Sequence, residues 1–294
     1  MGKQLRKIIS LNTWGGSGGT SIYKDILHLA ETADVLCLQE VHRAPAHYPR
    51  TVMPSDPGKR QLPLHTQFGN IVESMLSDCF VAHFAPQLVG CYHDCERAPE
   101  ELSELQYGNM VLVRREFSHT HESTFINGEL GQLFDAESMT PAGKTAQRID
   151  ITDGINVVSI VSGHGAWFRG DKGDQPWRLA QTEKLLRLAS HDYDHVDTLA
   201  LESDYLPRVV LLGDLNVLAS TKVIQLIKKS KVFGRVGADY LNGRYGIWDT
   251  RTDLYTGVHR EADHAFASPC LNAALAIDKS VASDHAALLV TIDT

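Results

Sequence analysis

The sequence predicts an α/β fold, and three observations support this prediction. Apolar runs of strand length alternate with amphipathic stretches of helical length along the whole chain, a pattern typical of α/β proteins. The 294 residues are 43% hydrophobic and 22% charged, with 23 Gly and 11 Pro, which excludes collagen-like, coiled-coil and disordered chains. No repeat, low-complexity tract or shift in composition divides the sequence, so we expect one domain over residues 1–294.

Short apolar runs predict the strands, which fall at residues 7–14, 35–41, 110–114, 156–162, 209–212, 263–267, 271–277 and 286–292. Amphipathic stretches predict the helices, which fall at residues 21–33, 68–76, 176–190 and 221–229. Pro176 favours a helix start, because its missing N–H group costs little in the first helical turn. Residues 45–63 and 90–105 are rich in Pro, His and charge, and we expect surface loops there that shape a cleft.

The charge balance is acidic, with 28 Lys and Arg against 36 Asp and Glu and a formal net charge of −8. Non-specific affinity for nucleic acid usually comes from a basic surface, so this balance argues against such binding, although an enzyme can still meet a phosphodiester in a local cleft. No apolar run approaches the roughly 18–20 residues of a membrane span, and the basic start is not followed by the apolar stretch of a signal peptide. We therefore expect a soluble, cytoplasmic monomer with no transmembrane segment.

The cysteines form an odd, sparse set that fits a reducing compartment better than a disulfide framework: Cys37, Cys79, Cys91, Cys95 and Cys270. The segment Cys91-Tyr-His93-Asp-Cys95 invites a zinc interpretation, with Cys79 and His83 as further ligands. Its spacing matches none of the common zinc patterns, so we predict a loop with free thiols instead.

Polar side chains stand where the predicted strands end, and for the last strand where it begins. They are Asn12, Glu40, His164, Asp214 with Asn216, and Asp284 with His285. If the last strand runs antiparallel to the others, its beginning lies at the same edge of the sheet as their ends. Each residue alone is more often the start of a solvated loop. Together they supply oxygen ligands for a hard cation such as Mg²⁺, and imidazoles for proton transfer.

The motifs that carry these residues resemble the endonuclease/exonuclease/phosphatase superfamily. They are Asn12-x-Trp14, Gln39-Glu40, Gly163-His164, Gly213-Asp214-Leu-Asn216, Ala262-Asp263-His-Ala-Phe and Ser283-Asp284-His285. They occur in the family order over nearly the whole chain. The superfamily includes deoxyribonuclease I, abasic-site endonucleases, neutral sphingomyelinases and inositol polyphosphate 5-phosphatases. The resemblance implies a four-layer α/β sandwich, with two mixed sheets packed face to face, helices outside and the active site at one rim.

The resemblance also implies roles for individual residues. It places Asn12, Glu40 and Asp284 on the side of a bound Mg²⁺ or Mn²⁺ ion. It makes His164 the residue that stabilises charge on the reacting phosphate, and Asp214 and Asn216 the pair that orients the attacking water and a phosphate oxygen. Asp263 then holds the catalytic His285. The family leaves open whether Asp214 or the Asp263–His285 pair takes the proton of the attacking water, and we favour the pair. Arg178 and Gln181 match a recurrent pattern that pins the loop after His164, whereas Gly163-His164-Gly165-Ala departs from the usual Thr-His-Leu.

Two other interpretations belong to different classes. Gly15-Gly-Ser17-Gly-Gly19 satisfies the nucleophile-elbow pattern of a serine esterase, but the elbow follows several strands in that fold and only one strand precedes Ser17 here. A catalytically inactive binding module on the same fold is the second, since a fold does not guarantee activity. The polar set is intact, which favours an enzyme.

We therefore expect a Mg²⁺- or Mn²⁺-dependent hydrolase that cleaves a phosphodiester or phosphomonoester by in-line attack of an activated water. The expected partner is a phosphate-ester substrate. A nuclease acting on DNA or RNA is the alternative within the same superfamily. The acidic balance and the lack of basic tracts favour small or lipid-like phosphodiesters.

Overall fold

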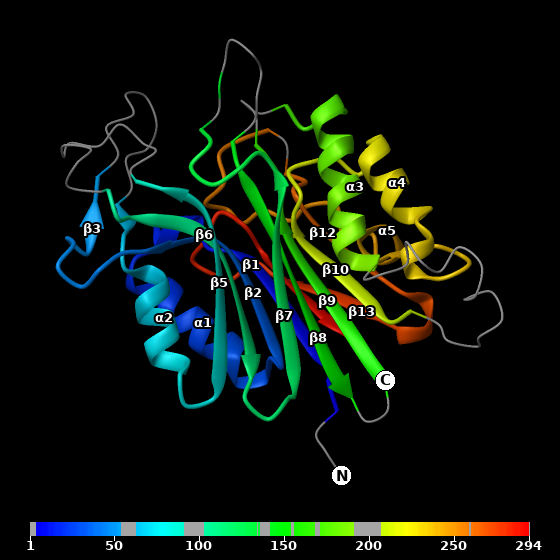
Figure 1. The fold of residues 1–294 in the computed structure, drawn as a ribbon, viewed down its shortest axis with the longest axis horizontal. Helices are drawn as coiled ribbons and strands as arrows, with labels where there is room; N and C mark the ends of the chain where they lie inside the picture. Colours follow the sequence, from blue (N-terminus) through cyan, green and yellow to red (C-terminus); the bar gives the residue numbers. More distant parts are fainter. Residues whose placement is uncertain are drawn as a thin grey trace.

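The computed structural model of the chain describes residues 4–53, 63–90, 103–133, 135, 142–153, 156–167, 171–190, 207–258 and 260–293. Two six-stranded mixed sheets pack face to face, and helices cover their outer faces (Figure 1). This arrangement confirms the four-layer α/β sandwich that the resemblance implies.

The first sheet brings the two ends of the sequence together. Its strand order is β13 (Ala274–Asp278), β14 (Ala287–Thr291), β1 (Lys7–Asn12), β2 (Val35–Arg43), β6 (Gln106–Arg114) and β5 (Phe80–Val89). β1 pairs parallel with β2 and antiparallel with β14. The start of β14 therefore lies at the same edge of the sheet as the ends of β1 and β2, as the sequence predicts.

The second sheet is built from the central part of the chain. Its strand order is β11 (Asp239–Tyr240), β12 (Asp263–Ala267), β10 (Val209–Asp214), β9 (Asn156–His164), β8 (Lys144–Asp153) and β7 (His119–Asn127). Only β9 and β10 run parallel, and β10 pairs antiparallel with β12. The ends of β9 and β10 thus meet the start of β12. A separate two-stranded sheet joins β3 (Thr51–Val52) and β4 (Leu64–His65).

The helices divide between the two outer faces (Figure 1). α1 (Thr20–Thr32) and α2 (Phe68–Leu76) share an apolar cluster with the first sheet, and α3 (Pro176–Ser190) and α4 (Lys222–Lys228) share one with the second. The short α5 (Leu241–Arg244) follows β11. Among the described residues, no helix has the length and apolar character needed to cross a membrane.

A third apolar cluster fills the space between the sheets. Val35 and Val111 contribute from the first sheet, and Ile149, Ile160 and Leu212 from the second, all at most 1% exposed. Side chains on successive strand positions alternate between this inner core and the outer ones. The inner core fixes one sheet on the other, so it also fixes the distance between polar groups at the rim of the sandwich.

The sequence prediction locates every helix longer than one turn in the described ranges, but it misses the two-residue strands β3, β4 and β11 and three long strands, β5, β7 and β8. β5 contains Pro86, β7 reads His-Thr-His-Glu-Ser-Thr, and β8 alternates apolar with charged residues. All three lie at or next to an open edge of their sheet. Across these edges, Nε2 of His83 on β5 lies 2.9 Å from Nε2 of His119 on β7. The strand predicted at residues 271–277 begins later, because Leu271 ends a 3₁₀ turn (Pro269–Leu271) and β13 begins at Ala274.

Two glycines let the strand ends that carry the predicted site approach closely. Gly213 has φ of +139°, and a Cβ atom there would lie 2.1 Å from the carbonyl oxygen of Gly163. A Cβ atom at Gly165 would lie 2.2 Å from the carbonyl oxygen of Leu215. The second glycine of the unusual Gly-His-Gly sequence, Gly165, therefore has a steric cause, because the backbone after β10 packs directly on the backbone after β9.

This contact makes Gly165 and Gly163 a matched pair of test positions. We expect Gly165→Ala to lower the free energy of unfolding by about 1–3 kcal/mol, because its Cβ would meet backbone that cannot move aside. Gly163→Ala should cost less than about 1 kcal/mol, because its Cβ would meet only the end of the Leu185 side chain, at 3.3 Å. Urea unfolding of both variants measures the difference, and equal losses would contradict the proposed contact.

Candidate active site

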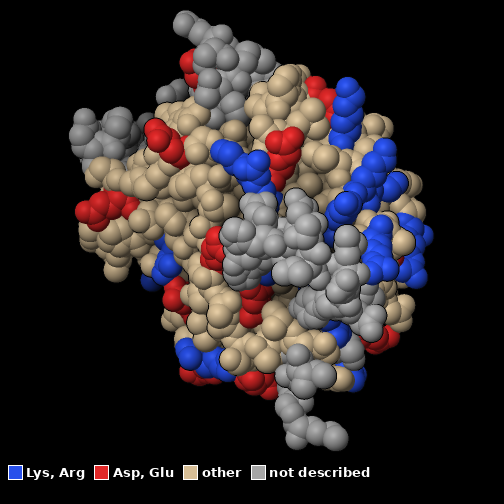
Figure 2. Space-filling model, turned by 45° about the vertical axis from the view of Figure 1, so that its right-hand side comes forward, with Lys and Arg blue, Asp and Glu red and all other residues tan. Residues whose placement is uncertain are grey.

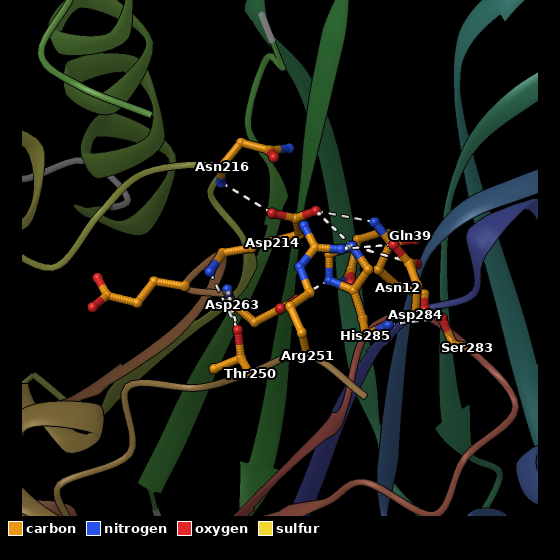
Figure 3. Close-up of polar contacts among 12 residues, drawn as sticks. Asn12, Gln39, Asp214, Asn216, Thr250, Arg251, Asp263, Ser283, Asp284 and His285 are labelled. Atoms are coloured by element: carbon orange, nitrogen blue, oxygen red, sulfur yellow. Dashed lines mark hydrogen bonds and ion pairs between the residues drawn. The ribbon is translucent and has the colours of Figure 1, made fainter. Parts of the chain in front are cut away.

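The predicted site residues all lie in the described part of the chain, and side-chain or backbone contacts join them into one network at the rim of the sandwich. They are Asn12, Glu40, His164, Asp214, Asn216, Asp263, Asp284 and His285. Figure 3 labels all of them except Glu40 and His164. The segment before β14 reaches the end of β1 directly, since Ser283 Oγ donates to the Asn12 carbonyl at 2.7 Å.

Glu40 owes its position to a β-bulge. Leu38 of β2 pairs with Met110 of β6, whereas Val41 pairs with Gly108, so β2 carries one extra residue between them. Glu40 has φ of +59°, in the left-handed region that non-glycine residues rarely adopt. Bulges of this kind re-aim a side chain next to an active site. Asn216, just after β10, also has a positive φ, of +54°.

The Asn12 side chain links the two sheets. Its Nδ2 donates to Glu40 Oε1 at 3.1 Å and to Asp214 Oδ2 at 3.0 Å, and its Oδ1 accepts from the backbone N of Trp14. The amide oxygen keeps a second lone pair. Asp214 accepts a further hydrogen bond at Oδ1 from the backbone N of Asn216. Asn12 thus holds two carboxylates from opposite sheets beside each other.

Asp263 and His285 form a buried hydrogen-bonded pair, with 2.8 Å between Asp263 Oδ2 and His285 Nδ1. The other imidazole nitrogen, Nε2, accepts from the guanidinium of Arg251 and lies 3.5 Å from Asp214 Oδ2. Burial lowers the pKa of His285 to about 4, and the charge of Arg251 adds to the shift. His285 is therefore neutral at neutral pH, with its proton on Nδ1 and a lone pair on Nε2.

His164 lies beside a buried lysine that the sequence interpretation did not include. Lys144 Nζ lies 3.4 Å from Nδ1 and 3.3 Å from Nε2 of His164, and His164 Nε2 lies 3.8 Å from Glu40 Oε1. Burial and the charge of Lys144 hold the pKa of His164 well below its usual value. Burial also lowers the pKa of Lys144, to about 8. Lys144, not His164, supplies the positive charge on this side of the site.

The sequence interpretation missed two cations, Lys144 and Arg251. Lys144 begins β8, which runs antiparallel to β9, so the reasoning about strand beginnings would have found it once β8 was assigned. Arg251 lies in an irregular segment whose one backbone bridge is to His285. No local pattern in the sequence marks that position.

The loop after His164 is held by the residues that the resemblance suggested. Gln181 Oε1 accepts from the backbone N of Ala166 at 3.0 Å, and the buried Arg178 donates to the backbone oxygens of Asp171 and Gly173. Further along the loop, Trp167 is 50% exposed. Residues 168–170 lie outside the described residues. Cys91, His93 and Cys95 do so too, and the loop with free thiols expected there stays a prediction.

Sequence comparison assigns the chain to a family. The model of the Endonuclease/Exonuclease/phosphatase family matches residues 9–285. The chain belongs to the endonuclease/exonuclease/phosphatase family. No curated protein sequence matches it.

Solved structures of endonuclease/exonuclease/phosphatase proteins share the fold. A family protein from Beutenbergia cavernae DSM 12333 superposes with a TM-score of 0.63 at 17% identity, over 99% of this chain and 72% of the other. Truncated Caenorhabditis elegans TDP2 superposes with a TM-score of 0.54 at 16% identity, over 98% of this chain and 97% of the other. The catalytic domain of human Nocturnin with a bound sulfate superposes with a TM-score of 0.55 at 15% identity, over 100% of this chain and 94% of the other. At these identities the likeness concerns the fold.

Endonuclease/exonuclease/phosphatase proteins typically use divalent metal ions, and the residues present here fit such an ion. Asp284 Oδ1 is buried and has no hydrogen-bond partner among the described residues. Burial raises the pKa of Asp284 and of Glu40, and neighbouring carboxylates add to both shifts. Clustered carboxylate oxygens with an open lone pair are ligands that Mg²⁺ or Mn²⁺ prefers.

A second group of side chains has the geometry of a cation site. Ligand atoms of Asp214, Asp263 and His285 lie within 4.8 Å of one another. The hydrogen bond between Asp263 and His285 already occupies one atom of each, so an ion bound there would break the pair. A metal ion held by Asn12, Glu40 and Asp284, as the resemblance implies, would leave that pair intact.

The serine esterase interpretation finds no support in the described geometry of this family member. Ser17 makes no hydrogen bond to His285 within the described ranges, and the two imidazole nitrogens contact Asp263 and Arg251 instead. The neighbouring Gly18 packs on the chain before β14, where a Cβ atom would lie 1.9 Å from the carbonyl oxygen of Ala282. The glycine-rich loop therefore supports the segment that carries Asp284 and His285.

Glu40 allows a test of the metal position without measuring activity. We expect Glu40→Gln to raise the free energy of unfolding in EDTA by about 0.5–2 kcal/mol, because it removes a buried charge from a cluster of carboxylates. Added Mg²⁺ at 100 times its Kd should stabilise the wild type by about 2.7 kcal/mol and the variant far less. Thermal unfolding with and without Mg²⁺ measures both effects.

Glu73→Gln is the control for this experiment. Glu73 lies on α2 and pairs with Arg43 of β2, and no described contact joins it to the carboxylate cluster. It should respond to Mg²⁺ as the wild type does. Equal stabilisation of Glu40→Gln and wild type by Mg²⁺ would remove Glu40 from the metal position.

Proposed function

We propose that the protein is a divalent-metal-dependent phosphoesterase that hydrolyses a phosphodiester or phosphomonoester by in-line attack of an activated water. One observation carries the proposal. The unprotonated Nε2 of His285 lies beside the oxygen cluster, 3.5 Å from Asp214 Oδ2 and 3.8 Å from Asp284 Oδ1. An unprotonated imidazole nitrogen next to a cation-binding cluster is what the attack of water on a phosphorus atom requires, and the attacking water would take the place of the Arg251 guanidinium, which donates to Nε2 in this structure.

His285 takes the proton of the attacking water at Nε2, and the carboxylate of Asp263 stabilises the imidazolium that forms. The hydrogen bond from Nδ1 to Asp263 also fixes the tautomer and the orientation of the ring. Asp214 is the weaker candidate for the base. Both of its oxygens accept hydrogen bonds, from Asn12 and from the backbone of Asn216, so it orients the water beside Nε2.

The opposite side of the site stabilises negative charge on the phosphate. Lys144 and the neutral His164 are both buried there, next to Glu40. A buried cation interacts strongly with developing charge, because little water screens it. Asn216 donates from Nδ2 to the Gly165 carbonyl at 3.2 Å, which keeps its amide at this edge of the site.

A divalent ion held by Glu40 and Asp284 with Asn12 would neutralise phosphate charge and stabilise the leaving oxygen. Asn12 contributes its remaining oxygen lone pair or orients Glu40 through Nδ2.

The charge distribution favours a small or lipid-like phosphodiester as the substrate. Figure 2 shows acidic and basic side chains interspersed over one face, with Lys and Arg gathered towards one side of it. The formal net charge of −8 is also unlike that of a protein that binds nucleic acid through a broad basic surface. A nuclease remains the second candidate, because the family match covers endonucleases and exonucleases as well as phosphatases.

A panel of substrates tests this function directly. Bis-p-nitrophenyl phosphate, plasmid DNA, sphingomyelin and inositol phosphates are each incubated with the full chain, with EDTA and after Mg²⁺ or Mn²⁺ is restored. We expect hydrolysis of at least one phosphodiester that stops with EDTA and returns with the metal, because the proposed ligands are oxygens only. Activity that survives EDTA, with labelling of Ser17 by a fluorophosphonate, would identify a serine esterase. No turnover of any substrate would favour a binding module.

Mutations in the Asp263–His285 pair test which group is the base. We expect His285→Ala to lower kcat by a factor on the order of 10²–10⁴, the usual contribution of a positioned acid or base. Asp263→Asn should also lower kcat, and the double variant should lose little beyond His285→Ala, because the two residues act as one unit. Asn12→Ala should mainly raise the Mg²⁺ concentration needed for half-maximal activity.

His28→Ala is the control, because His28 is exposed on α1. Its kcat should equal that of the wild type. Losses that multiply fully in the double variant, or a His285→Ala enzyme near the wild-type rate, would leave Asp214 as the base.

A further inference from the structure

The guanidinium of Arg251 occupies the middle of the carboxylate cluster, a position that the function proposed above does not use (Figure 3). Arg251 is only 5% exposed, although it comes from the irregular segment between α5 and β12. A charged side chain is almost never buried to this extent unless it is paired. Its partners therefore indicate what the buried charge does.

Arg251 contacts both the metal side and the base side of the site. Nη1 donates to Asp284 Oδ2 at 2.9 Å and also to Nε2 of His285. The guanidinium carbon stacks over the ring of Tyr255 at 4.3 Å, which fixes the plane of the group. Arg251 Nε is buried and has no hydrogen-bond partner in the described part of the chain. One buried donor of the guanidinium group is thus left without a partner among the described residues.

Arg251 also stands where a second cation would bind. The atoms that could hold such an ion belong to Asp214, Asp263 and His285. The guanidinium already contacts His285 there, and the charges of Asp214 and Asp263 stabilise it. A divalent ion and the guanidinium cannot both lie against the same imidazole nitrogen.

We propose that Arg251 takes the place of a second divalent ion, so that this enzyme binds one metal ion per chain and Arg251 provides the remaining positive charge beside Asp214 and His285. The inference rests on the proposed function, because it concerns the metal of the same site. It makes Arg251 a residue that determines how many ions the site accepts.

The experiment is a titration of the full chain with Mn²⁺, followed by calorimetry and by electron paramagnetic resonance. The wild type should bind one Mn²⁺ per chain and give the spectrum of an isolated ion. Arg251→Met removes the guanidinium group but keeps an apolar side chain of similar reach. This variant should bind two Mn²⁺ ions per chain. Two ions bound by these carboxylates would lie roughly 3.5–4 Å apart and give a spin-coupled spectrum. Arg251→Lys keeps a positive charge and should bind one.

Arg244→Met is the matched control. Arg244 lies on α5 and pairs with Asp239 of β11, so the variant removes one arginine charge away from the carboxylate cluster of the site. It should bind one Mn²⁺, as the wild type does. Thermal unfolding checks that each variant is folded, and Arg251→Gln replaces Arg251→Met if the latter does not fold. Two ions in the wild type, or a single ion in folded Arg251→Met or Arg251→Gln, would overturn the proposal.

The outcomes also separate this inference from the proposed function. A wild type that hydrolyses a phosphodiester with one bound ion, together with a folded Arg251 variant that also binds one, overturns only the role of Arg251. A wild type that binds no Mn²⁺ and hydrolyses nothing overturns the proposed function and this inference with it.

Discussion

The hydrogen bonds of the candidate site cross from one sheet to the other, and the rest of the site depends on this crossing. Asn12 on β1 reaches Asp214 on β10, and His285 before β14 reaches Asp263 on β12. Hydrogen bonds tolerate errors of only a few tenths of an ångström. The apolar core between the sheets supplies this accuracy, since close-packed interiors deform little. Core packing and site geometry are therefore one constraint, imposed by side chains far from the site.

Burial of so many ionisable groups requires compensation, and the compensation shapes the chemistry. Carboxylates that lose water keep their charge only beside cations or hydrogen-bond donors. The charge of Lys144 stabilises the carboxylate of Glu40, and Arg251 forms an ion pair with the carboxylate of Asp284. The same two cations, together with burial, keep His164 and His285 neutral. The groups that make the cluster stable in the fold thus also set its protonation state.

The sequence predicts most of this fold and most of this site, for identifiable reasons. β1, β2 and β10 are buried on both faces and read as apolar runs, so their polar ends stand out as Asn12, Glu40 and Asp214. β8 alternates charged and apolar residues near a sheet edge, and its first residue, Lys144, was missed along with it. Arg251 reaches the site from an irregular segment, and only tertiary structure places it there. Contacts made by irregular backbone leave no periodic signal in a sequence.

Because Glu40 lies in the β-bulge of β2, a deletion could remove it without changing how the rest of β2 pairs with β6. Leu36, Leu38 and Val41 all belong to the outer core, so the extra residue lies between two stretches of regular alternation. A chain that lost Glu40 through a three-nucleotide deletion would pair β2 with β6 in continuous register, with every apolar side chain still on its own face and the left-handed backbone gone. The fold does not need this residue. A descendant with an intact sandwich but without the Glu40 carboxylate is therefore one deletion away.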